Sequence, residues 1–155
     1  MVHSFPTRRS SDLFLLRLPG RLPAGAVRQQ VVSTLDLTPS ILALAGAPPE
    51  AGLDGLDVIP ALAEDRPLPE RALCWRLHKP EATRGAIRSG DRKLLFTLDP
   101  AGEPTQVRLY DLASDPGESR DLAVEGADEA AALLARWRAW NATLSQPAFA
   151  PLKMH

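Results

Sequence analysis

The sequence predicts an α+β fold in which a short α/β segment is followed by a small antiparallel sheet packed by a C-terminal helix. Three observations predict it: strand patterns separated by tight turns over residues 71–110, an apolar helical stripe over 128–144, and a proline-punctuated helix-and-loop passage before residue 66. A chain of 155 residues with 45% hydrophobic residues is typical of a globular protein with its own core.

Composition limits the partners that the chain can have. Lys and Arg number 18 against 19 Asp and Glu, so the chain carries no basic field that would indicate nucleic acid. No apolar run approaches the roughly 20 residues that span a bilayer, so no membrane span is expected. The single cysteine, Cys74, excludes an internal disulfide and a cysteine-rich metal site.

The chain begins with two weakly patterned stretches. Residues 1–13 have no hydrophobic periodicity and are interpreted as a non-native or disordered leader outside the fold. Leu16 to Leu18 alternate as in a short strand, which Pro19 and Gly20 would end.

The next stretch predicts a helix that ends at Gly46. Asp36 or Thr38 can cap its start, and Pro39 suits the first turn because its missing N–H has no partner there. Its apolar positions recur at helical spacing and are interpreted as one face that packs on a core: Leu37, Ile41, Leu44 and Ala45.

Residues 46–70 form a loop-rich passage with a polar, proline-punctuated hinge at its end. We place a boundary near Arg66, which divides the chain into segments 14–65 and 66–151. Residues 71–78 alternate and are predicted to be the first strand of the second segment.

An antiparallel meander is predicted to follow this strand. Residues 86–88 and 93–98 read as a hairpin whose turn uses Gly90, and residues 106–110 read as the next strand. The sequence Asp115-Pro-Gly-Glu118 then bends the chain sharply. Arg88 and Lys93 are expected to pair across the meander with Asp111, Asp115 or Glu118.

The last predicted element is a helix over residues 128–144 that Asp128 would cap. A partner-binding surface is one interpretation of its apolar stripe, but closure over the sheet is favoured. The stripe consists of Ala130, Leu133, Trp137, Trp140 and Leu144.

Two motifs of the meander resemble the C-terminal subdomain of the sulfatase family. They are Ala86-Ile-Arg-Ser-Gly-Asp-Arg-Lys-Leu-Leu95 and Leu109-Tyr-Asp-Leu-Ala-Ser-Asp-Pro-Gly-Glu-Ser-Arg-Asp-Leu-Ala123. The predicted helix that ends at Gly46 resembles a further segment of that family. The resemblance implies that residues 14–65 are a remnant of the alkaline-phosphatase-like α/β core and that residues 66–151 are the C-terminal subdomain.

The resemblance also implies a parent enzyme that hydrolyses sulfate esters of a small molecule or glycan. Sulfatases use a formylglycine made from the cysteine of a C-x-P-S-R motif, together with calcium held by Asp and Asn side chains. Here Cys74 lies in Leu73-Cys-Trp-Arg76 and cannot be matched to that nucleophile. We therefore expect no catalytic residue and no metal ligand in this chain, and its partner would be a missing N-terminal catalytic portion.

If the family's C-terminal subdomain walls the substrate cleft, the candidate substrate-binding residues here are Trp75, Arg76, His78 and Lys79. Guanidinium and ammonium groups suit a sulfated ligand, and an indole suits stacking on a ring. The alternative is structural: Trp75 would belong to the core, and the three polar residues to a solvated edge.

Two other functions remain open from the sequence. One is a fragment of a related phosphodiesterase or phosphoglycerol transferase, which a threonine or serine nucleophile upstream would indicate. The other is a free-standing β-meander interaction module. A sulfatase fragment, unlike such a module, predicts exposed apolar surface on residues 14–62 and poor solubility. The parent enzyme could be periplasmic or secreted, but the sequence leaves its compartment unknown.

Overall fold

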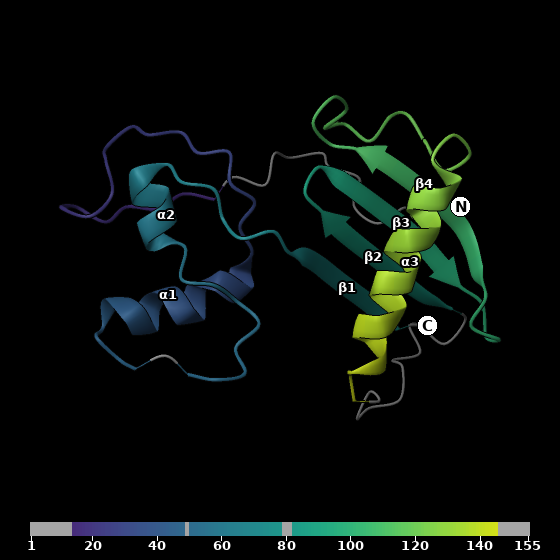
Figure 1. Ribbon diagram of the computed structural model, residues 1–155, viewed down its shortest axis with the longest axis horizontal. Coiled ribbons are helices and arrows are strands. Elements are labelled where there is room, and N and C mark those ends of the chain that lie inside the picture. The colour runs from purple at the N-terminus through teal and green to yellow at the C-terminus, as the bar shows by residue number, and fades with distance from the viewer. Residues whose placement is uncertain (1–13, 49, 79–81, 146–155) are drawn as a thin grey trace, which may run out of the picture. The chain divides into compact units, whose positions relative to one another are not determined.

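The computed structural model describes residues 14–48, 50–78 and 82–145, and the chain divides into two compact units between Glu70 and Arg71. The first unit contains the 3-10 helix η1 (Thr34–Asp36) and helices α1 (Leu37–Leu44) and α2 (Ile59–Glu64). The second contains strands β1 (Ala72–His78), β2 (Thr83–Ser89), β3 (Arg92–Leu98) and β4 (Pro104–Asp111), and helix α3 (Ala127–Ala142). Figure 1 shows these elements, and the predicted α+β class is confirmed.

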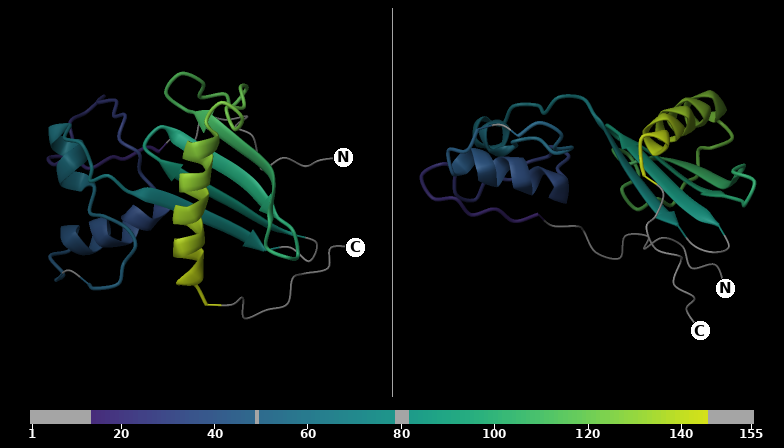
Figure 2. Two further views of the ribbon diagram at one scale, coloured as in Figure 1. Left: turned by 45° about the vertical axis from the view of Figure 1, so that its right-hand side comes forward. Right: turned by 90° about the horizontal axis from the view of Figure 1, so that it is seen from below.

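The four strands form the predicted antiparallel meander, in the order β1-β2-β3-β4. Gly90 sits in the β2–β3 turn with φ +57°, a left-handed conformation that glycine adopts without steric cost. Helix α3 covers one face of this sheet (Figure 2). The apolar stripe of α3 therefore packs on the sheet, which is the interpretation that the sequence favoured.

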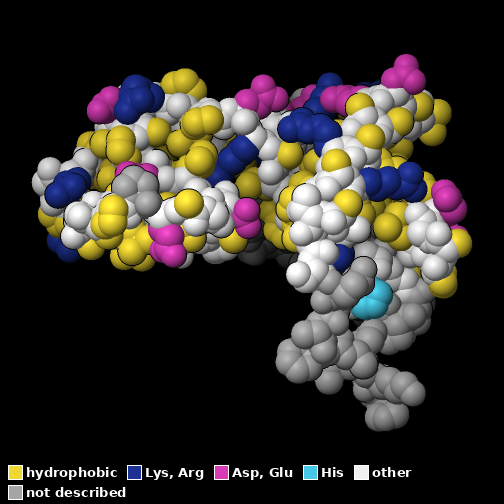
Figure 3. Space-filling model, turned by 60° about the horizontal axis from the view of Figure 1, so that its bottom comes forward, with side chains coloured by type: hydrophobic (Ala, Val, Ile, Leu, Met, Phe, Trp, Pro, Cys, Tyr) yellow, Lys and Arg dark blue, Asp and Glu magenta, His cyan; other side chains and the backbone are white. Residues whose placement is uncertain are grey.

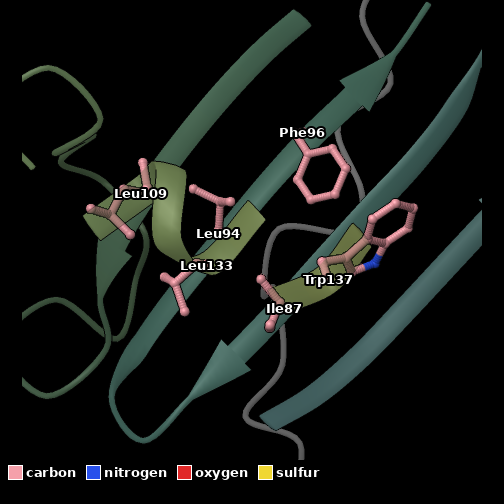
Figure 4. Close-up of a cluster of buried hydrophobic side chains, with 7 residues drawn as sticks. Ile87, Leu94, Phe96, Leu109, Leu133 and Trp137 are labelled. Carbon is pink, nitrogen blue, oxygen red and sulfur yellow. The ribbon is translucent and has the colours of Figure 1, made fainter. Parts of the chain in front are cut away.

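A single apolar cluster lies between α3 and the sheet (Figure 4). Trp137 is fully buried there, and its ring meets that of Phe96 edge to face, with centroids 4.8 Å apart. The sheet contributes alternate residues because side chains of a strand point to opposite faces. The buried members are Ile87, Leu94, Phe96, Leu109, Ala130, Leu133 and Trp137.

Gly85 makes room for Phe96 inside this cluster. The two residues are directly opposite each other on β2 and β3. A Cβ atom at Gly85 would lie 2.2 Å from the Phe96 ring, closer than atoms can approach. Glycine at this position therefore leaves space for the Phe96 ring, which contacts Trp137.

Both edges of the sheet are covered in part by hydrogen bonds from outside the ladder. At β4 the N–H of Leu109 donates to Asp121 Oδ1 (3.0 Å), and the N–H of Leu122 donates to the Leu109 carbonyl (2.8 Å). At β1 the indole N–H of Trp137 donates to the Trp75 carbonyl (2.9 Å). Groups satisfied in this way are no longer open to pairing with another strand.

The carboxylate-rich corner after β4 forms as predicted, but only one of its two expected ion pairs does. Lys93 Nζ lies 2.6 Å from Glu118 Oε1. The prediction for Arg88 is wrong, because its guanidinium turns back to its own hairpin, donating to the Gly90 carbonyl and lying 4.0 Å from Asp91. The side chain reaches the adjacent turn before it can reach a carboxylate two strands away.

The predicted capping of α3 by Asp128 is also wrong. The helix begins at Ala127, and the N-cap is Gly126, which makes no side-chain cap. A Cβ at Gly126 would lie 2.8 Å from Leu109 Cδ2, so the chain passes too close to the sheet for a capping side chain. Asp128 and Glu129 instead occupy the first turn, where carboxylates interact favourably with the helix dipole.

Two sequence predictions fail in the first unit. Leu16 to Leu18 are not a strand, because a strand needs a neighbour and the described part of this unit contains none. Conversely, α2 lies in a passage predicted to be loop, where Ile59, Ala61 and Leu62 gain burial by forming a short helix.

Helix α1 forms where predicted, but its buried side is not the predicted one. Leu37 and Ile41, assigned to a core-facing side, are exposed, whereas Asp36 and Ser40 are buried. Asp36 does not cap α1; its carboxylate accepts the N–H groups of Ser33 and Leu56. Those hydrogen bonds fix which side of the helix faces its own unit.

The expected exposure of apolar surface on the first unit is confirmed. Large exposed apolar side chains occur along this segment, at positions that include Leu15, Val27, Leu35 and Ile41. Within the described residues, none of the helices is long and apolar enough to cross a bilayer.

Candidate functional site

Strand β1 carries three of the four predicted substrate-binding residues, but it does not present them on one face. Cys74 packs on the cluster beneath α3 and pairs with Ile87, so the even-numbered positions of β1 face the helix. Arg76 and His78 share that face, whereas Trp75 points to the opposite, outer face. Lys79 lies outside the described residues.

Arg76 is engaged by the end of helix α3. Its Nη1 donates to Asn141 Oδ1 (3.0 Å), and its Nη2 donates to the Ser145 carbonyl (3.2 Å). A carbonyl near the end of a helix is a natural partner for a cation, because the helix dipole is negative there. The guanidinium thereby ties β1 to the α3 terminus.

His78 is exposed at the end of β1 and meets the next strand. Its Nδ1 lies 2.9 Å from Thr83 Oγ1, its direct partner in the β1–β2 register. This hydrogen bond holds the ring against β2.

Trp75 is exposed on the outer face of the sheet, with 44% of its surface accessible. Its direct neighbour on β2 is Ala86, which is buried on the same face. Arg84 and Arg88 flank Ala86 on the same face, because they are two positions away on the same strand. The three side chains therefore share the outer face of the sheet, with the Arg88 guanidinium turned toward Gly90 and Asp91 of its own hairpin.

Sequence reasoning missed the two arginines on this outer face. It grouped Trp75 with its chain neighbours, although successive residues of a strand point in opposite directions. The signal was available in the hairpin: pairing residues 72–78 against 83–89 places Arg84 and Arg88 beside Trp75. We name the group Trp75, Arg84 and Arg88 the outer-face cluster.

The described residues do not fit a metal site or an activated cysteine. They contain no group of three or more His, Cys, Asp or Glu side chains that could hold a metal ion. Burial raises the pKa of the Cys74 thiol and outweighs the opposing charge of Arg136, so the thiol is held in its protonated form.

Known proteins are similar to this chain in both sequence and structure, although no family model matches the sequence. Arylsulfatase A of Homo sapiens is 36% identical over an alignment of 124 residues, and the match covers 67% of this chain and 24% of the relative. Arylsulfatase A of Bos taurus is 36% identical over 133 residues, covering 73% of this chain and 26% of the relative. The chain thus spans about a quarter of the length of these curated relatives.

A solved structure shares the fold over most of the chain. The protein called Ps i-CgsB, solved in complex with k-i-k-neocarrahexaose, superposes with a TM-score of 0.74 and is 25% identical. The match covers 87% of this chain and 30% of that one.

Proposed function

Because this chain belongs to the sulfatase family, we propose that it is the C-terminal part of a sulfatase, an enzyme that hydrolyses sulfuric esters. The observation that carries the proposal is the 36% identity to arylsulfatase A over two thirds of this chain. The solved structure that shares this fold supports it.

In this proposal the chemistry belongs to the portion of the enzyme outside this chain. Sulfate-ester hydrolysis by a sulfatase calls for a formylglycine nucleophile and a calcium ion, which are nucleophilic and metal-ion catalysis on one charged centre. The sequence has one cysteine, in Leu-Cys-Trp-Arg, and the described residues offer no metal cluster. We therefore expect the chain by itself to be inactive toward sulfate esters.

The contribution of this chain would be to close the fold and to wall the substrate cleft with the outer-face cluster. Trp75 would stack on a sugar or aryl ring, and Arg84 would meet a sulfate group of that ring. Arg88 would do so after its guanidinium leaves the Gly90 carbonyl. The support is the exposure of the indole and the shared face of the three side chains. A sulfated glycan suits this arrangement, and the similar solved structure was obtained with a saccharide bound.

The coding sequence upstream of the Phe14 codon provides the first test. A reading frame that encodes C-x-P-S-R would support a sulfatase, whereas threonine or serine in the nucleophile position would indicate a phosphodiesterase or phosphoglycerol transferase. The extended polypeptide is then assayed with 4-nitrophenyl sulfate and bis(4-nitrophenyl) phosphate, beside this chain alone. Sulfate release by the extended polypeptide only is the expected result, and turnover by the chain alone would contradict the proposal.

The role of the outer-face cluster is tested in the same extended enzyme. Trp75→Ala and Arg88→Ala should raise KM for a sulfated oligosaccharide and leave kcat for 4-nitrophenyl sulfate unchanged. Arg138→Ala, which removes an exposed cation from α3, is the matched control. Equal KM values in all three variants would exclude the outer face from substrate binding.

A further inference from the structure

Helix α1 turns its polar side toward its own unit and its apolar side outward. Asp36 and Ser40 are 1% and 4% exposed, whereas Leu37 and Ile41 are 37% and 60% exposed. An amphipathic helix of a globular protein normally does the opposite, because burying apolar surface is what drives packing. The helix therefore has an outward face that its own unit does not use.

Hydrogen bonds fix the polar side of α1 against the loop before α2. The Asp36 carboxylate accepts the N–H of Ser33 (2.7 Å) and of Leu56 (2.9 Å). Ser40 Oγ accepts the N–H of Val58 (3.1 Å). Rotating α1 to bury Leu37 and Ile41 would leave these groups unpaired, at a cost of about 1–3 kcal/mol for each buried group.

Gly55 fixes the same contact by close packing. A Cβ atom at Gly55 would lie 2.0 Å from the Leu35 carbonyl oxygen, so the loop touches η1, directly before α1, backbone to backbone. The orientation of α1 is therefore set by its unit, and the outward face is a stable feature of the fold.

Apolar exposure is concentrated in this unit. Of the large apolar side chains that are exposed in the described residues, eight lie between Phe14 and Leu53 and three lie beyond Glu70. Figure 3 shows hydrophobic side chains over much of the surface of the first unit. A surface of this kind on a soluble chain marks an interaction site.

We propose that the Leu37–Ile41 face of α1 packs against an apolar surface of the catalytic portion of the same sulfatase. This inference rests on the proposed function. The chain matches 24% of human arylsulfatase A and 30% of the similar solved structure, so most of such an enzyme lies outside it and is large enough to cover the face. Helix α1 contains no charged residue, which suits an apolar partner surface.

The test compares the same substitutions in this chain and in the extended polypeptide. Leu37→Ser and Ile41→Ser remove the outward face, and Val124→Ser, at a position 90% exposed in the second unit, is the matched control. In this chain alone, Ile41→Ser and Val124→Ser should keep the unfolding midpoint, because these side chains are 60% and 90% exposed. In the extended polypeptide, Ile41→Ser should lower the midpoint by more than roughly 2 °C, and Val124→Ser should not.

The possible outcomes distinguish the packing of the Leu37–Ile41 face, called here the docking face, from the proposed function. An active extended sulfatase whose midpoint is insensitive to Leu37→Ser and Ile41→Ser would overturn the docking face alone. An extended polypeptide that cleaves only the phosphate ester, but loses stability with Ile41→Ser, would overturn the sulfatase function and keep the face. A stable dimer of this chain that Ile41→Ser dissociates, with no effect in the extended polypeptide, would assign the face to a second copy and overturn the proposal.

Discussion

The indole N–H of Trp137 donates a 2.9 Å hydrogen bond to the carbonyl oxygen of Trp75, and so joins the buried face of α3 to the edge strand of the sheet. The same indole meets Phe96 edge to face. One side chain thus closes the core and satisfies a backbone group that would otherwise be open to pairing. The same hydrogen bond fixes the backbone of Trp75, whose side chain points to the outer face of the sheet.

Trp137→Phe should lower the free energy of unfolding of the second unit by about 1–3 kcal/mol, since it removes a hydrogen bond and leaves space in the core. Urea unfolding followed by circular dichroism measures this loss. Trp140→Phe is the control, because Trp140 is only half-buried and its indole makes a tilted contact with Trp137. Equal losses for the two variants would contradict the role assigned to Trp137.

Gly85→Ala should destabilise the sheet by about 1–3 kcal/mol, because the added methyl group overlaps the Phe96 ring and forces it off its position. Thermal unfolding measures the effect. Gly117→Ala is the matched control: its Cβ would meet only Asp115 Oδ1, at an ordinary 3.6 Å. The explanation fails if both alanine variants unfold at the wild-type temperature.

Asp36→Ala should loosen the first unit, because it leaves the part-buried N–H groups of Ser33 and Leu56 without their acceptor. The expected cost is about 1–3 kcal/mol for each donor. Hydrogen exchange at the Leu56 amide should become faster by at least one order of magnitude. Asp54→Ala, at an exposed loop position, should leave that rate unchanged; an unchanged rate in Asp36→Ala as well would show that the carboxylate is dispensable.

Lys93→Met should destabilise the corner after β4, because it leaves the Glu118 carboxylate, only 5% exposed, without its cation. We expect a loss of about 1–3 kcal/mol, reduced from that of a fully buried pair because Lys93 is partly exposed. The double variant Lys93→Met/Glu118→Gln should recover part of the loss, which a double-mutant cycle in urea measures. Simple additivity of the two single variants would show that the pair does not couple.

Acid should weaken the same corner through Asp115. The N–H of Arg120 is the main group that lowers the pKa of this carboxyl, helped by the N–H and hydroxyl of Ser119, and partial desolvation opposes it. A folded-state pKa below the unfolded one gives stability that is present above about pH 3.9 and is lost as the pH falls through the folded-state pKa.

The titration of Asp115 is measured by NMR of its carboxyl carbon, and stability by urea midpoints between pH 7 and pH 2. Asp115→Asn should reduce the acid dependence of the midpoint, whereas Asp54→Asn should leave it unchanged. Protonation of Asp115 at or above the ordinary aspartate pKa would contradict this account.

Much of the second unit could be predicted from the sequence because its signals are local. The alternation of apolar and polar residues predicted the strands, and Gly90 predicted the hairpin turn. The helical spacing of Leu133 and Trp137 predicted the buried side of α3. The outer-face cluster could not be read by following the chain, since Trp75, Arg84 and Arg88 come together only through the register of two strands.

The first unit shows the opposite case. The spacing of Leu37 and Ile41 predicted a helix correctly but assigned the wrong buried side, because periodicity shows which residues share a face and not what that face contacts. The buried side of α1 is set by hydrogen bonds that join Asp36 and Ser40 to Leu56, in a loop some 16–20 residues away.

The sequence by itself determined the α+β class and the order of the strands, because turn residues and hydrophobic periods act over a few residues. The resemblance to the family came from the motifs of residues 86–95 and 109–123. Only the tertiary structure decided which side of α1 is buried, which groups hydrogen-bond to the sheet edges, and which arginines lie on the same face of the sheet as Trp75. Those choices depend on contacts between residues that are far apart in the chain, and no local pattern encodes them.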